Sequence, residues 1–108
     1  MNYYDYLKNL VNQEIECLSQ EGLLPTELDY EKINITLIKD KNFGDLASNA
    51  AMALSKLAKK PPHEIAILIA ERLSKISEIS EVDIAGPGFI NFRLNEKFWY
   101  SRLKEVLQ

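Results

Sequence analysis

Two short apolar runs joined by a tight turn occupy positions 81–94, which read EVDIAGPGFINFRL. The runs Glu81–Ala85 and Phe89–Leu94 have the length and the β-branched and aromatic content of strands. The connecting Gly86-Pro87-Gly88 predicts a rigid structural turn, because glycine can adopt positive φ. Its spacing is not that of a dinucleotide-binding loop. The second run is apolar on both faces, which predicts a central strand of a sheet.

One more strand is predicted upstream of this hairpin. Over positions 32–38, Ile33, Ile35 and Leu37 alternate with polar residues, as expected for a half-buried strand. This strand could pair beside either of the two later ones, and the sequence leaves both pairings open.

Four stretches carry helical periodicity. The first runs from about Asn2 to Gln20, with Gly22 as a stop signal, and the second from about Asp45 to Lys59, with Asp45 as its N-cap. A third follows Pro61-Pro62, since proline fits the first turn of a helix. A fourth, capped by Asn95, carries Phe98, Trp99, Leu103 and Val106. We therefore predict an α+β fold in which a small, mostly antiparallel β-sheet packs with about four α-helices.

The length of 108 residues suits one domain, residues 1–108. No apolar stretch is long enough to span a bilayer, and the polar N-terminus lacks a signal-peptide core, so we expect no membrane partner. The single cysteine, Cys17, cannot form an internal disulfide, which favours a reducing, cytoplasmic setting. The last predicted helix has no stop signal, which indicates that the chain continues in a larger parent protein.

The net charge of −3 hides an uneven distribution. Positions 39–75 hold seven basic and four acidic residues, a net +3, and the remainder is −6. Such asymmetry can mark a local anion-binding surface on an acidic protein. A set of solvated helix faces would give the same count, so charge alone leaves both interpretations open.

Catalytic motifs are scarce. The only histidine, His63, falls in the first turn of a predicted helix, where a surface or capping role is expected. Cys17 lies beside the apolar stripe of the first helix, which predicts partial burial. The sequence contains no zinc-ligand cluster, no phosphate-binding glycine loop and no calcium-binding ladder. We expect no cofactor in this domain, and the chain does not look like a complete enzyme.

The stretch NFGDLASN, positions 42–49, is the best candidate for binding. Phe43 could stack on an exposed base, and Gly44 could let a ligand approach closely. Polar side chains could hydrogen-bond base edges or 2′-hydroxyls; these are Asn42, Ser48 and Asn49. Phosphates would meet Lys56, Lys59 and Lys60. The alternative is an ordinary capped loop with Phe43 packed in the core.

Two strings and their spacing resemble the N-terminal domain of arginyl-tRNA synthetase: NFGDLASNAAM at 42–52 and VDIAGPGFINF at 82–92. Between them, Lys60-Pro61 and Glu64-Ile65-Ala66 are similar to the family's helix-linking pattern. The resemblance covers essentially the whole chain.

This resemblance implies a domain that contacts the D-loop at the outer corner of tRNA-Arg. The parent would be a class I synthetase that uses ATP, with Mg²⁺, to attach arginine to tRNA, and would be monomeric. Its partners would be the tRNA and the remainder of its own chain, whose nucleotide-binding signatures would follow residue 108. The D-loop-facing candidates are Phe43, Leu46 and Ser48, with Asn42, Gly44 and Asn49 beside them.

One position departs from the family pattern. Many relatives carry an aromatic residue directly after Gly-Asp, where this chain has Leu46. Leucine has no π-face, so base stacking would have to come from elsewhere, for instance Phe43. The alternative function is a non-catalytic interaction or structural module that docks through its last helix.

Overall fold

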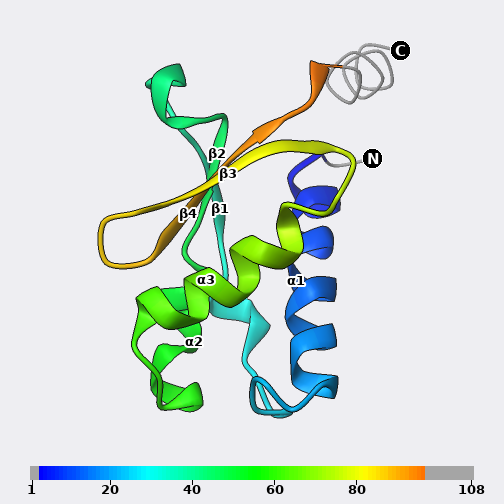
Figure 1. Cartoon of the computed structure of the whole chain (residues 1–108), viewed down its shortest axis with the longest axis vertical. Helices are drawn as coiled ribbons and strands as arrows, with labels where there is room; N and C mark the ends of the chain where they lie inside the picture. The colour runs from blue at the N-terminus through cyan, green and yellow to red at the C-terminus, as the bar shows by residue number, and fades with distance from the viewer. Residues whose placement is uncertain (1–2, 97–108) are drawn as a thin grey trace.

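The computed structural model describes residues 3–96 (Figure 1). Its helices are α1 (Tyr3–Gln20), α2 (Ala50–Ala58) and α3 (Pro62–Leu73), with 3-10 turns η1 (Tyr30–Lys32) and η2 (Lys41–Phe43). Its strands are β1 (Ile35–Leu37), β2 (Leu46–Ser48), β3 (Ile79–Ala85) and β4 (Phe89–Leu94). The strands form one antiparallel sheet in the order β1-β2-β4-β3. The predicted α+β class is confirmed, with three helices in the described part; the helix expected after Asn95 lies outside the described residues.

The hairpin β3–β4 forms as predicted, and β4 is central, between β2 and β3. Its turn uses positive φ at Gly86 (55°) and Gly88 (153°). A Cβ on Gly88 would lie 2.9 Å from Cβ of Pro62, so this turn packs directly on the start of α3. The glycine therefore serves both the turn and the close contact between the hairpin and the helix.

The prediction of one helix from Asp45 to Lys59 is wrong at its start. Residues 46–48 form β2, which pairs with β1 on one side and with β4 on the other. The strand β1 therefore pairs with neither β3 nor β4, the two partners that the sequence left open. Pairing across the sheet outweighs the helix propensity of the alanine-rich run, and the helix starts only at Ala50, whose N–H donates to Ser48 Oγ (3.1 Å).

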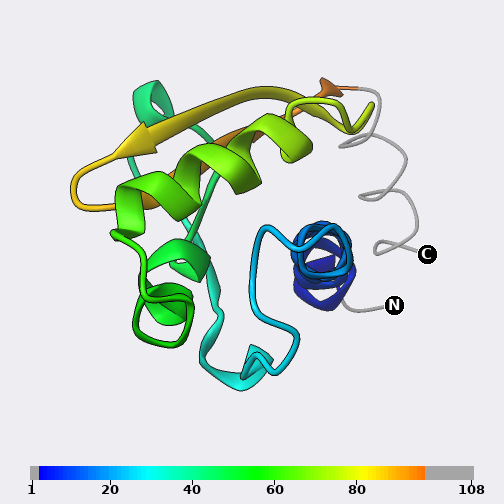
Figure 2. The same ribbon diagram turned by 60° about the horizontal axis from the view of Figure 1, so that its bottom comes forward.

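The helices cover one face of the sheet (Figure 2). The core joins one face of each helix to the inward residues of the central strand; it includes Leu7, Val11, Ile15, Leu18, Ile65, Ile69, Leu73, Ile90, Phe92 and Leu94. The helix α1 ends at Gln20, just before the predicted stop residue Gly22, which has φ of 81°, and Leu23 N–H donates to Leu18 O (3.0 Å). None of the helices in residues 3–96 is long and apolar enough to cross a membrane.

Candidate nucleic-acid interface

The other face of the sheet is left uncovered by the described helices, and we call it the open face. Along β4, Ile90, Phe92 and Leu94 are buried, whereas the alternate residues Phe89, Asn91 and Arg93 are on the open face. Asn91 is the centre of this face, because the sheet register sets it between Ala47 of β2 and Asp83 of β3. Phe89 is 41% exposed. The open face thus offers an aromatic ring about 7 Å along the strand from an amide.

The turn η2 presents a second aromatic ring. Phe43 is 63% exposed, so the alternative in which it packs in the core is wrong. Asp40 organises the turn: its Oδ1 accepts from the N–H of Asn42 (3.0 Å), and its carbonyl accepts from the N–H of Phe43 (3.1 Å). Asn42 is also exposed. The ring therefore projects from an ordered turn, held there by local hydrogen bonds.

Gly44 does not have the predicted role of admitting a ligand. It is buried, with φ of 122°, and a Cβ there would lie 3.2 Å from the backbone carbonyl oxygen of Phe92. The backbone of residue 44 passes against β4, and any side chain would push the two apart. The glycine thus brings η2 close to the central strand.

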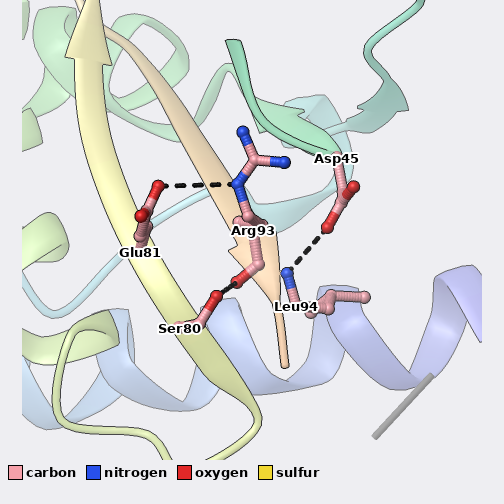
Figure 3. A network of polar contacts seen from close by, with 5 residues as sticks. All are labelled: Asp45, Ser80, Glu81, Arg93 and Leu94. Atoms are coloured by element: carbon pink, nitrogen blue, oxygen red, sulfur yellow. Dashed lines mark hydrogen bonds and ion pairs between the residues drawn. The ribbon is translucent and has the colours of Figure 1, made fainter. Parts of the chain in front are cut away.

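Asp45 is not a helix N-cap, contrary to prediction. It is 8% exposed, its N–H donates to Phe92 O (3.0 Å), and its Oδ2 accepts from the N–H of Leu94 (2.9 Å; Figure 3). A buried carboxylate that accepts a backbone N–H makes a strong, directional contact. Together with Gly44, Asp45 fixes the position of Phe43 relative to the open face.

An ion pair lies beside this anchor. Arg93 Nε is 3.5 Å from Glu81 Oε2, and Ser80 Oγ donates to the carbonyl of Arg93 (3.2 Å; Figure 3). Where η2 meets the sheet there is a notch of about 10 Å³, lined by Asn42, Phe43, Gly44, Glu81, Asp83, Asn91, Phe92 and Arg93. That is about the space of one water molecule, so a ligand here would lie on the surface.

Three of the predicted contact residues have structural roles. Leu46 and Ser48 are 0% exposed: Leu46 packs in the core, and Ser48 Oγ caps α2. Their side chains do not reach the surface, so neither Leu46 nor Ser48 supplies a direct contact there. Asn49 bridges to the segment before β1, accepting from Asn34 N–H (2.7 Å) and donating to Lys32 O (3.1 Å). These residues hold the inner strand β2 and the start of α2 in place beside the site.

The predicted phosphate contacts lie elsewhere. Lys56 and Lys59 are exposed, while Lys60 is partly buried and pairs with Glu64 (3.8 Å). These lysines lie at and just after the end of α2, at the opposite end of the molecule from η2 (Figure 1). The structure therefore does not bring them together with Phe43.

His63 is exposed in the first turn of α3, where it was expected. Cys17 is exposed on α1, so its predicted partial burial is wrong; it lies between the buried Ile15 and Leu18 but points away from the core. Within residues 3–96, no group of three or more His, Cys, Asp or Glu side chains is arranged to hold a metal ion.

Sequence analysis missed Phe89 and Asn91 as candidate contacts. The prediction that β4 is apolar on both faces includes Phe89 and gives Asn91 no role. The signal was present: Ile90, Phe92 and Leu94 alternate perfectly, so residues 89 and 91 had to lie on the other face.

Comparisons with known proteins agree with one another. The family model of the arginyl tRNA synthetase N-terminal domain matches residues 5–94. The chain is 41% identical over all 108 residues to an arginine–tRNA ligase of Parvibaculum lavamentivorans, of which it covers 18%. It is 40% identical over 103 residues (95% of the chain) to that of Shewanella amazonensis, again covering 18%. The chain therefore spans less than a fifth of the length of these relatives.

Two solved structures share the fold. Arginyl-tRNA synthetase from Plasmodium falciparum superposes with a TM-score of 0.72 at 17% identity, over 97% of this chain and 18% of that one. The Thermus thermophilus arginyl-tRNA synthetase gives a TM-score of 0.66 at 23% identity, over 99% of this chain and 16% of that one.

Proposed function

Because this chain belongs to the family of arginyl tRNA synthetase N-terminal domains, we propose that it is the tRNA-contacting module of an arginine–tRNA ligase. In this proposal, the open face and Phe43 bind unpaired bases in the D-loop of tRNA-Arg. The observation that carries it is Phe43, a large aromatic side chain 63% exposed beside an uncovered sheet face with an amide at its centre.

The chemistry of the open face suits bases better than phosphates. Aromatic rings such as Phe43 and Phe89 provide stacking surfaces for unpaired bases, and the amide of Asn91 can both donate to and accept from a base edge. Glu81 and Asp83 on the same face would repel phosphate groups. A single-stranded loop, whose bases can turn outward, is the RNA element that fits this surface.

The proposal extends to the whole protein of which this chain is a part. We assign residues 1–108 to one N-terminal domain, which supports the attachment of arginine to tRNA by a class I catalytic domain further along the chain. That catalytic domain would bind ATP and Mg²⁺, and a monomeric parent in the cytoplasm would have tRNA-Arg and its own remaining domains as partners. The role of residues 1–108 is to orient the tRNA.

The test is a binding measurement with the 108-residue chain and a tRNA-Arg transcript. Losing one stacked base costs about 1–3 kcal/mol, so Phe43→Ala should raise Kd at least about fivefold, and Asn91→Ala should also weaken binding. Ile67→Ala is the matched control, because it truncates an apolar side chain that is 48% exposed on α3. It should leave Kd unchanged.

A second transcript with a replaced D-loop completes the test. Wild-type chain should bind it at least as weakly as Phe43→Ala binds the native transcript, and Phe43→Ala should not weaken binding to the replaced loop any further. Equal wild-type affinity for the two transcripts would contradict the proposed function.

A further inference from the structure

The segment between β2 and α3 has an unusual charge. Positions 46–63 contain three lysines and no aspartate or glutamate, in a chain with 16 acidic residues. We call its end, residues 56–63, the α2–α3 corner. Lys56, Lys59 and His63 are exposed there, and the first acidic side chain is Glu64, which pairs with Lys60. The corner is therefore a local cationic surface with Lys56 and Lys59 at its centre.

Lys59 has a backbone conformation that does not favour lysine. With φ of 55° and ψ of 40°, it is the one non-glycine residue in the described part of the chain with positive φ. Glycine is the usual residue at this position after a helix, because a Cβ is strained in the left-handed region. The stability of the fold would be served better by glycine. A lysine here calls for a role of its side chain that glycine cannot supply.

The backbone at the corner is well ordered. Ser55 O accepts from the N–H groups of Lys59 and Lys60, and Ser55 Oγ donates to Lys60 O (2.6 Å). Pro61 and Pro62 then fix the entry into α3. The starting points of the lysine side chains are thus set by the fold, which lowers the entropic cost of holding them against a partner.

The corner and the open face differ in place and in chemistry. The corner lies at the opposite end of the molecule from η2 and Phe43 (Figure 1), and the open face carries Glu81 and Asp83 where the corner carries lysines. Only the Phe89 end of the open face comes near the corner, where Gly88 packs on Pro62. We propose that the α2–α3 corner is a second RNA contact, which binds backbone phosphates of a stretch separate from the loop whose bases lie on the open face. This inference rests on the proposed function, since it takes the partner to be the same tRNA.

The two contacts should contribute different properties to binding. Each lysine–phosphate contact increases the magnitude of the slope of log K against log[salt] by about one. Such a contact does not distinguish one nucleotide sequence from another. Base contacts give discrimination between loop sequences and little salt dependence. The corner should therefore account for salt dependence, and the open face for selectivity.

The test is a salt titration of tRNA-Arg binding by the 108-residue chain. Lys56→Ala with Lys59→Ala should lower the magnitude of the slope by about 2 and leave the ratio of affinities for native and D-loop-replaced transcripts unchanged. Lys8→Ala with Lys75→Ala is the matched control, because it removes the same charge from α1 and from the segment just after α3. It should change the slope much less.

Phe43→Ala with Asn91→Ala should give the reverse pattern, losing selectivity and keeping the slope. If both lysine pairs lower the slope equally, net charge alone explains it and the corner is no site. If the lysine variants lower the slope as predicted but Phe43→Ala with Asn91→Ala keeps the selectivity for the native transcript, the proposed function is wrong while the corner still binds RNA.

Lys59→Gly separates the binding role from a structural one. Relief of the strained backbone should raise the Tm by about 4 °C, while the salt slope falls by about 1 as in Lys59→Ala. A lower Tm would show that Lys59 is there to stabilise the end of α2, and unchanged binding would show that its charge meets no phosphate. Either result would overturn the inference.

Discussion

The hydrogen bond from Leu94 N–H to Asp45 holds the turn with Phe43 against the sheet, and Asp45→Ala tests its importance. Asp45 is 8% exposed, and its Oδ2 lies 2.9 Å from the backbone nitrogen of Leu94, in the last residue of β4. Alanine would leave that buried N–H without its acceptor. An unsatisfied buried donor costs about 1–3 kcal/mol, and a contact to a charged acceptor falls in the upper part of that range.

The expected loss of stability is therefore about 2–3 kcal/mol, or a fall in Tm of about 8–12 °C for a domain of this size. Thermal unfolding followed by circular dichroism measures it. Asp45→Asn should recover much of the loss, because an amide oxygen can still accept the Leu94 N–H. Asp83→Ala is the control: this carboxylate is exposed on the neighbouring strand β3 and should change the free energy of unfolding by no more than about 0.5 kcal/mol.

The same variant should weaken tRNA binding. Asp45 touches no proposed ligand, but without its side chain the segment after η2 loses the hydrogen bond to Leu94 N–H and keeps backbone contacts to β4 such as Asp45 N–H to Phe92 O. Phe43 would then lose its fixed place beside Asn91. If Asp45→Ala unfolds at the wild-type temperature and binds tRNA-Arg as tightly as the wild type, Asp45 does not anchor η2 to the sheet.

Two further predictions concern the frame of the domain. Gly88→Ala should lower the free energy of unfolding by about 2 kcal/mol or more, because it strains a φ of 153° and brings a methyl group within 2.9 Å of Pro62 Cβ. Gly22→Ala is the control: its φ is 81° and nothing lies within 4 Å, so it should cost only about 1 kcal/mol. Equal Tm values for the two variants would show that Gly88 is not needed for packing against Pro62. The hydrogen bond from Arg72 lowers the pKa of Glu21 below its usual value of 4.5, so this pair stabilises the fold above that pH and stops doing so as the pH falls through the lowered pKa. The Tm difference between wild type and Glu21→Gln should be small at pH 7 and should vanish once the pH has fallen below the lowered pKa of Glu21; a difference that grows in acid would show the opposite linkage.

The sequence predicted the parts of the fold that depend on local patterns. Helix α1 with its Gly22 stop, the proline-led α3 and the β3–β4 hairpin all carry strong periodicity or turn signals. The strand β2 could not be found this way, because its three residues run straight into an alanine-rich helix. Its pairing with β1 and β4 is a long-range contact that no local pattern encodes.

That one missed strand explains most of what sequence analysis got wrong about the site. A helix from Asp45 would have placed Leu46 and Ser48 in its first turn, beside the candidate loop, and Asp45 at a helix end. In the sheet, the first two are buried and Asp45 binds the backbone of β4. The correct prediction was Phe43 as an exposed ring, and Phe89 and Asn91 join it only once the faces of β4 are known.

A photo-cross-link from position 43 tests the central claim most directly. With p-benzoylphenylalanine in place of Phe43, irradiation of the complex with tRNA-Arg should attach the chain to nucleotides of the D-loop, and the same group at position 67 on α3 should not. Cross-links from position 43 that fall outside the D-loop, or that match those from position 67, would contradict the account of the open face as a base-binding surface.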